Sequence, residues 1–134
     1  MKSESEMLTL EAMLTGVAPF RSTAYYDKHL DAIRVEIENC SICEERQDSI
    51  VTLYRRNRPN NEGADAIVGF SIKGVRSLLH RLGLPETGTV NIAELITKLV
   101  AVYPDTATGL VADLYQEQKD SLPEGIEVPE AVAA

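Results

Sequence analysis

The sequence contains no tryptophan, only two histidines and only two cysteines among its 134 residues. Histidine and cysteine supply many catalytic and metal-ligating groups, so few such sites can be assembled from this chain. Cys40 and Cys43 have no second pair of cysteines or histidines at the spacing that a zinc site requires. No phosphate-binding loop, nucleophile elbow or dinucleotide-binding fingerprint occurs. The sequence therefore predicts a protein that is not an enzyme and that holds no metal or cofactor.

Long hydrophobic runs and targeting signals are also missing from the sequence. No run approaches the roughly 18 apolar residues that a membrane-spanning helix needs. Residues 1–6 are acidic overall, whereas a secretory signal begins with basic residues. Two cysteines three positions apart do not resemble the dense disulfide framework of a small secreted domain. We therefore expect a cytoplasmic protein that does not interact with membranes.

The composition is that of one globular domain followed by a different C-terminal segment. Apolar residues make up 44% of the chain and charged residues 25%, which is ordinary for a folded domain. Domains cluster near roughly 100 to 150 residues, so a second core is not expected. Residues 121–134 contain two prolines, three glutamates and little periodicity. We expect a single helical domain over residues 1–120 and a mobile acidic tail over residues 121–134.

Apolar side chains recur every three or four positions between residues 23 and 56, as in a heptad repeat. This pattern predicts one long central helix. At 1.5 Å per residue the helix would span roughly 50 Å, more than a compact domain of this size can cover. An uncovered apolar stripe favours pairing with a second copy, so we expect a homo-oligomer, most simply a dimer. The predicted interface consists of Tyr26, Leu30, Ile33, Ile37, Cys40, Val51 and Tyr54.

A single β-hairpin near residues 49–72 is an alternative to the second half of that helix. Residues 49–56 and 64–72 are both rich in β-branched and aromatic residues, which are typical of strands. The segment between them contains proline, asparagine and glycine, which suit a loop. If the hairpin forms, the fold is α+β instead of all-α.

Four further helices are predicted from apolar residues that repeat with the helical period. Their expected ranges are residues 3–15, 68–82, 91–102 and 105–119. Asn91 and Glu94 have the spacing of a capping box, which marks the start of a helix. Together with the long central helix they make about five helices, so the predicted fold class is all-α.

The net charge of -8 disfavours nonspecific binding to nucleic acid, because the field of the protein repels polyanions. The charge is unevenly distributed, however, since residues 51–90 carry six lysines and arginines against three acidic residues. This segment supports an alternative function, which is nucleic-acid binding through residues 55–81. The phosphate-contacting residues would be Arg55, Arg56, Arg58, Lys73, Arg76 and Arg81.

The absence of catalytic patterns and the long apolar stripe favour a non-enzymatic interaction protein, regulatory or related to assembly. We expect it to bind itself and another protein whose identity the sequence does not specify. A nucleic-acid-binding regulator is the alternative function. A small accessory or structural protein of a phage or plasmid is a third interpretation that fits the size and acidity of the chain.

Overall fold

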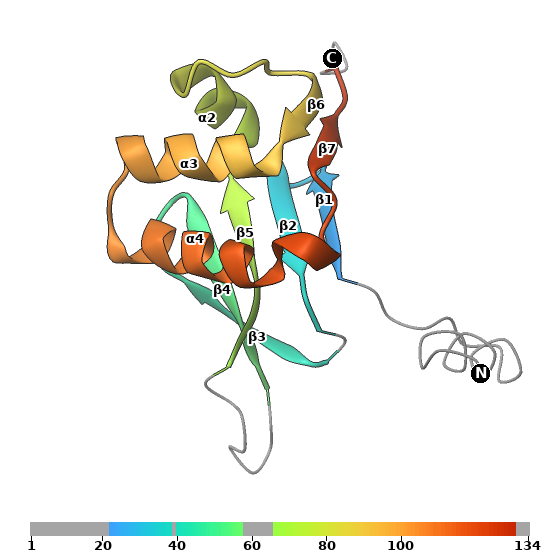
Figure 1. The fold of residues 1–134 in the computed structure, drawn as a ribbon, viewed down its shortest axis with the longest axis vertical. Coiled ribbons are helices and arrows are strands. Elements are labelled where there is room, and N and C mark those ends of the chain that lie inside the picture. Colours follow the sequence, from blue (N-terminus) through green and yellow to red (C-terminus); the bar gives the residue numbers. More distant parts are fainter. Residues whose placement is uncertain (1–21, 39, 58–65, 131–134) are drawn as a thin grey trace, which may run out of the picture.

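The computed structural model describes residues 22–38, 40–57 and 66–130 (Figure 1). In these residues the chain forms a five-stranded antiparallel sheet, a two-stranded sheet, three α-helices and one 3-10 helix, η1. The strands are β1 (Thr23–Asp27), β2 (Ala32–Glu36), β3 (Ile42–Arg46), β4 (Val51–Arg56), β5 (Ile67–Lys73), β6 (Gly88–Asn91) and β7 (Gly125–Val128). The helices are α2 (Val75–Arg81), α3 (Ile92–Val102), α4 (Thr106–Gln118) and η1 (Lys119–Ser121).

The five-stranded sheet has the strand order β1-β2-β5-β4-β3, and every neighbouring pair is antiparallel. Two hairpins, β1–β2 and β3–β4, therefore lie on either side of β5. Ser71 in β5 lies opposite Arg34 of β2 and also opposite Thr52 of β4. The central strand thus sets the register between the two hairpins.

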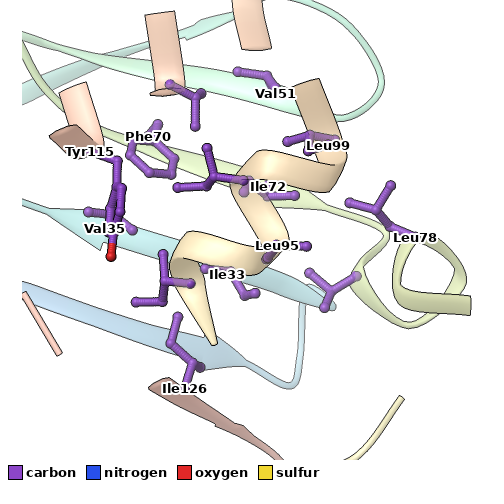
Figure 2. Close-up of a cluster of buried hydrophobic side chains, with 14 of the residues drawn as sticks. Ile33, Val35, Val51, Phe70, Ile72, Leu78, Leu95, Leu99, Tyr115 and Ile126 are labelled. Carbon is purple, nitrogen blue, oxygen red and sulfur yellow. The ribbon is translucent and has the colours of Figure 1, made fainter. Parts of the chain in front are cut away.

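One face of this sheet, which we call the covered face, packs against α3 and α4 (Figure 1). Successive residues of a strand point to opposite faces, so every second residue of the inner strands reaches this layer. Figure 2 shows these side chains gathered with Leu95 and Leu99 of α3 and with Tyr115 of α4. Burying each large apolar side chain contributes about 1.5 to 3 kcal/mol, which makes this layer the main source of stability. The covered face contains Ile33, Val35, Val51, Leu53, Phe70 and Ile72.

Helices α3 and α4 begin at capping side chains and lie within two of the ranges expected from the sequence. The amide of Glu94 donates a hydrogen bond to Asn91 Oδ1 at 2.9 Å. The amide of Thr108 donates to Asp105 Oδ1, also at 2.9 Å. Such caps satisfy amides that have no partner inside the helix, which is why both helices start at these positions.

The predicted all-α fold with a long central helix is wrong, because residues 23–56 form the four strands β1 to β4. Asp27 and Asp48 mark the places where the chain turns and does not continue as a helix. The carboxylate of Asp27 accepts hydrogen bonds from the amides two and three residues later, and Asp48 does the same. These local bonds favour turns, which reverse the chain between β1 and β2 and again between β3 and β4.

The alternative of a β-hairpin near residues 49–72 describes this region better than the helix does. β4 and β5 pair antiparallel, with Leu53 opposite Phe70, although they belong to a larger sheet. The helix expected over residues 68–82 is correct only in its second half, since α2 starts at Val75. The sheet hydrogen bonds of β5 continue to Lys73, and the chain then turns at a glycine with a φ of 64°.

The expected mobile tail is wrong for the described residues beyond 120. β7 pairs with β6, and Ile126 is only 3% exposed. Nη2 of Arg76 donates a hydrogen bond to the carbonyl of Pro129 at 2.6 Å, which fastens the chain beyond β7. Ile126 and Val128 alternate with Glu127, which is the sequence pattern of a strand. The composition of the whole segment does not show this pattern. Residues 131–134 and the helix expected over residues 3–15 lie outside the described residues.

Candidate ligand-binding site

The face of the five-stranded sheet that points away from α3 and α4, which we call the open face, is hollowed. The hollow has a volume of about 330 Å³. Its lining comes from β2, β3, β4, β5 and the turn between β1 and β2. It combines two cations, one carboxylate, three hydroxyl groups and two apolar side chains. The lining residues are Arg34, Lys73, Glu44, Thr52, Ser71, Tyr54, Leu30 and Ala32.

Strand register brings these side chains together from four strands. Ser71 lies between Arg34 and Thr52, and Tyr54 lies opposite Glu44. Directly paired residues have Cβ atoms about 4.5 to 5.5 Å apart, so their side chains are in contact range. The lining residues of each strand are two positions apart, which places all of them on the same face of the sheet.

The side chains of Arg34 and Tyr54 are stacked inside the hollow. Cζ of Arg34 lies 5.5 Å from the centre of the Tyr54 ring, and its Nε donates a hydrogen bond to Tyr54 Oη at 3.0 Å. Tyr54 is 1% exposed, so the arginine lies over a buried ring. This cation–π contact and the hydrogen bond together fix the plane of the guanidinium group.

Gly69 allows the ring of Tyr54 to lie across β5. The two residues are cross-strand partners. A Cβ atom at position 69 would lie 2.3 Å from the carbonyl oxygen of Val35 and 2.9 Å from Cδ2 of Tyr54. A residue other than glycine would therefore force apart β2 and the tyrosine ring. The position of Arg34 depends on this close approach, because the arginine rests on the ring.

Arg34 has carboxylates on two sides but no close hydrogen bond to either of them. Its Nη2 atom is 3.8 Å from Glu36 Oε1 and 3.7 Å from Glu44 Oε1, which are ion-pair distances and too long for hydrogen bonds. Burial acts to lower the pKa of Arg34, but Tyr54, Tyr25 and Glu36 favour the charged form and raise that pKa overall. The guanidinium therefore stays charged and keeps donors on its terminal nitrogens.

Thr52 carries a hydroxyl group without a hydrogen-bond partner. Among the residues that the structure describes, its Oγ1 is the only buried side-chain oxygen or nitrogen in this condition. The residue is 2% exposed and lines the hollow. An unsatisfied buried hydroxyl costs about 1 to 3 kcal/mol. A group that enters the hollow and bonds to Oγ1 would recover part of this cost.

Lys73 and Leu30 line the hollow near the turn between β1 and β2. Nζ of Lys73 forms no hydrogen bond or ion pair with any residue of the described ranges. Leu30 is 62% exposed, unusually open for a leucine. Beside the hollow, Tyr25 is the cross-strand partner of Arg34, and burial followed by the charge of Glu36 raises its pKa, so its hydroxyl stays neutral. This edge of the hollow therefore offers one positive charge and one apolar surface.

The residues of the predicted dimer interface do not share one surface. The helix that would have aligned them does not form, and alternate residues of a strand face opposite ways. Ile33 and Val51 lie in the core and Tyr26 and Ile37 pack against it, whereas Leu30 and Tyr54 line the hollow and Cys40 is half-buried. Only part of the predicted stripe therefore reaches the open face.

The basic residues of the predicted nucleic-acid site are also not brought together as one patch. Arg55 Nε lies 2.8 Å from Glu45 Oε2, and Arg56 Nε lies 2.5 Å from Glu38 Oε2, so acidic neighbours offset both charges. Arg81 Nη1 donates to the hydroxyl of Tyr103 at 2.8 Å, Arg76 bonds to Pro129, and Lys73 lines the hollow. Arg58 lies outside the described residues.

The two cysteines do not form a reactive pair. Cys40 is half-buried, Cys43 is exposed on β3, and both thiols are free. Burial and the neighbouring carboxylate of Glu38 raise the pKa of Cys40. A thiol with a raised pKa forms little of the nucleophilic thiolate at neutral pH.

No motif in the sequence indicates that Arg34, Glu44, Thr52 and Ser71 belong to one site. They are far apart along the chain, and only the strand order brings them together. A usable signal is present in Val51–Arg56, where Thr52 and Tyr54 alternate with apolar residues, and at the end of Ile67–Lys73, where Ser71 and Lys73 lie on either side of an isoleucine. A polar residue at every second position of a strand indicates a second, polar face.

Comparisons with protein-family models, with curated proteins and with solved structures found no match. In the described ranges, no helix has the length and apolar character needed to cross a membrane. The same ranges contain no cluster of three or more histidine, cysteine or acidic side chains that could hold a metal ion. The geometry of the open face is therefore the basis for a functional proposal.

Proposed function

We propose that this protein is a non-catalytic binding module that holds a small polar ligand in the hollow of its open face. The observation that carries the proposal is that Thr52, one of the residues lining the hollow, has a buried hydroxyl group with no hydrogen-bond partner among the described residues. Buried polar groups are almost always hydrogen-bonded in folded proteins. A bound ligand supplies the missing partner.

The size and chemistry of the hollow support a small molecule as the ligand. Ligand pockets commonly have volumes of roughly 300 to 1,000 Å³, and the hollow lies at the lower end of that range with about 330 Å³. Such pockets combine apolar surface with a few fixed polar groups. Here Leu30 and Ala32 supply the apolar surface, and the stacked Arg34 supplies a fixed charge.

Binding without catalysis fits the residues of the hollow. Its one carboxylate, Glu44, has a side chain that is 60% exposed and lies 3.7 Å from Arg34. A general base is usually desolvated or placed against a nucleophile so that its pKa approaches neutrality. An exposed carboxylate beside a guanidinium is instead placed to act as a hydrogen-bond acceptor.

A regulatory role, with the ligand as the signal, is part of this proposal. The hollow lies on the face opposite α3 and α4, so a bound ligand changes a surface that another protein can reach. Self-association through a long helix is not carried over, because that helix does not form. Nucleic-acid binding is not proposed, because carboxylates offset the charges of Arg55 and Arg56.

The variant Thr52→Val tests the proposal because it removes the hydroxyl and keeps the shape of the side chain. We expect the free energy of unfolding to stay the same or to rise by up to about 1 kcal/mol, since an unsatisfied polar group is removed. A screen of small polar compounds by two-dimensional NMR on the whole chain should identify ligands that shift the signals of Thr52, Ser71 and Arg34. Those ligands should bind Thr52→Val more weakly.

The matched control is Thr97→Val on α3, whose hydroxyl donates to the carbonyl of Ala93 at 2.8 Å, outside the hollow. This variant should bind the same ligands as the original protein. The proposal is wrong if no compound shifts signals from the hollow, or if both valine variants bind equally well.

A further inference from the structure

We propose that the ligand of the hollow is a small monocarboxylic acid that also carries a hydroxyl or amino group. This inference rests on the proposed function, since it names the chemistry of the ligand for the same site. Three features of the hollow support it: the two cations, the carboxylates beside them, and the hydrogen-bonding capacity of Thr52.

The two cations are placed to hold one anionic group. Arg34 and Lys73 lie on the same face of adjacent strands, two positions apart in register, because Ser71 is the partner of Arg34. Diagonal neighbours of this kind have Cα atoms about 7 to 8 Å apart, within reach of two long side chains. The terminal nitrogens of Arg34 have a plane fixed by Tyr54, which suits the two oxygens of a carboxylate.

The charges around the hollow favour one negatively charged group on the ligand. Glu36 and Glu44 lie 3.8 and 3.7 Å from Arg34, so they offset the charge of that guanidinium, whereas Lys73 has no ion-pair partner among the described residues. A phosphate with two charges would be repelled by both carboxylates and by the overall charge of -8. A carboxylate brings one charge and a flat pair of acceptors, which match the N–H donors of a guanidinium and an ammonium group.

The remaining polar groups call for a hydrogen-bond donor on the ligand. Glu44 accepts hydrogen bonds but cannot donate them, and its side chain is largely exposed. Thr52 Oγ1 can both donate and accept. A hydroxyl or ammonium group next to the carboxylate would donate to Glu44, while a ligand oxygen accepts from Thr52.

The apolar part of the ligand should be short. Leu30 and Ala32 are the aliphatic side chains of the lining, so the hollow offers little apolar surface to a long alkyl chain. Short 2-hydroxy and 2-amino acids satisfy all of these conditions. Simple fatty acids satisfy all of them except the donor.

The experiment is an NMR titration of the full chain with four probes: lactate, alanine, propionate and inorganic phosphate. We expect lactate or alanine to shift the signals of Arg34 Nε and of the Thr52 and Ser71 amides at the lowest concentrations. Propionate lacks the donor and should bind more weakly, and phosphate should bind weakest of the four. Equal binding of propionate, or tighter binding of phosphate, overturns the inference.

Three variants divide the contributions of the side chains. Arg34→Gln should weaken binding of the hydroxy or amino acid by roughly tenfold to a hundredfold, because a hydrogen bond to a charged group contributes about 1.5 to 3 kcal/mol. Glu44→Gln should reduce the preference for lactate or alanine over propionate. Arg81→Gln, which changes an arginine on α2 outside the hollow, is the control and should leave binding unchanged.

Lys73→Gln provides a second test of the anionic group if Arg34→Gln does not fold. It removes the other cation without touching the stack on Tyr54. Unchanged carboxylate binding in every folded variant that lacks one of the two cations contradicts the inference.

Failure of this inference can be distinguished from failure of the proposed function. If a neutral or cationic compound shifts the hollow signals and the acids do not, the hollow binds a ligand of a different class. The proposed function then stands and the inference is wrong. If no compound of any class shifts these signals, both are wrong.

Discussion

The two faces of the five-stranded sheet are equally buried at their centre but chemically opposite. Phe70 and Ser71 are neighbours in β5, and their exposed fractions are 0% and 4%. Phe70 points into a layer of apolar side chains under the helices, whereas Ser71 points into a hollow with charges and hydroxyl groups. Low exposure alone therefore does not identify the core. The polarity of the buried residue separates the face that stabilises the fold from the face that can bind.

The largest expected effect comes from removing the strand that completes the layer on the covered face. Truncation after Asp120 deletes Leu122, Ile126 and Val128, which together contribute about 5 to 9 kcal/mol by burial. This is comparable to the whole stability of a small domain, so we expect the truncated chain to be largely unfolded at room temperature. Thermal melting followed by circular dichroism measures the effect.

Point variants in β7 provide the control for that truncation. Ile126→Ala should lower the stability clearly, and Glu127→Ala, at the exposed position next to it, should not. A truncated chain that melts at the original temperature would show that the covered face does not need β7.

The second prediction compares the two faces directly at neighbouring positions. Phe70→Ala should lower the free energy of unfolding by about 3 to 5 kcal/mol, because it leaves a cavity in a closely packed layer. Ser71→Ala should change it by about 1 kcal/mol or less, because it removes one hydroxyl beside a hollow. Urea unfolding of both variants gives the two values. Equal losses would contradict the distinction between the faces.

The third prediction concerns the close approach of Tyr54 to Gly69. Gly69→Ala should lower the free energy of unfolding by about 1 to 3 kcal/mol through overpacking, and it should shift the NMR signal of Arg34 Nε. Gly109→Ala is the matched control, since no atom lies within 4 Å of the added Cβ in α4. The free energy of unfolding of that variant should be about 0.5 to 1 kcal/mol higher, because alanine has a higher helix propensity than glycine. A stable Gly69→Ala protein with an unmoved Arg34 signal would disprove the account of the stack.

The smallest expected effect lies where the covered side of the sheet reaches solvent. Glu45 is the cross-strand partner of Leu53, and hydrogen bonds from Arg55 and then Gln47 lower the pKa of its carboxyl below the usual 4.5. A lowered folded-state pKa stabilises the fold above pH 4.5, and this contribution is lost as the pH falls through the folded-state value. Glu45→Gln should therefore melt slightly lower than the original protein at pH 7, and the difference in melting temperature should shrink as the pH is lowered below 4.5.

A double-variant cycle controls this measurement. Arg55→Gln removes the other partner of the pair. At pH 7 the double variant should therefore lose less free energy of unfolding than the two single variants lose together. Strictly additive losses would show that the pair does not contribute to stability.

The parts of the fold that depend on local chemistry could be predicted from the sequence. The capping residues Asn91 and Asp105 mark the starts of α3 and α4, and the amides they satisfy belong to the next few residues. The sheet could not be predicted in the same way. Apolar spacings of three and four residues in residues 23–56 predict a helix. The turns at Asp27 and Asp48, which interrupt any such helix, depend on hydrogen bonds that form only in the folded chain.

The candidate site was harder to predict because its residues are far apart in the sequence. Arg34 and Thr52 are brought together only when β5 inserts between the two hairpins. Their isolated polar character carried no motif. Tyr54 and Leu30 belong to the predicted apolar stripe and do line the hollow. They meet there because of the pairing of strands, whereas the stripe was predicted as one face of a helix.

The contact between Gly69 and Tyr54 also constrains how this sequence can diverge. A Cβ atom at position 69 would lie 2.3 Å from the backbone carbonyl oxygen of Val35, and a smaller side chain at position 54 would not relieve that clash, so glycine should be retained at position 69 in homologous chains. The contact between Gly69 and Tyr54 depends on the register between β4 and β5. A glycine in one strand matched with an aromatic residue in its neighbour is therefore a marker by which distant relatives can be sought.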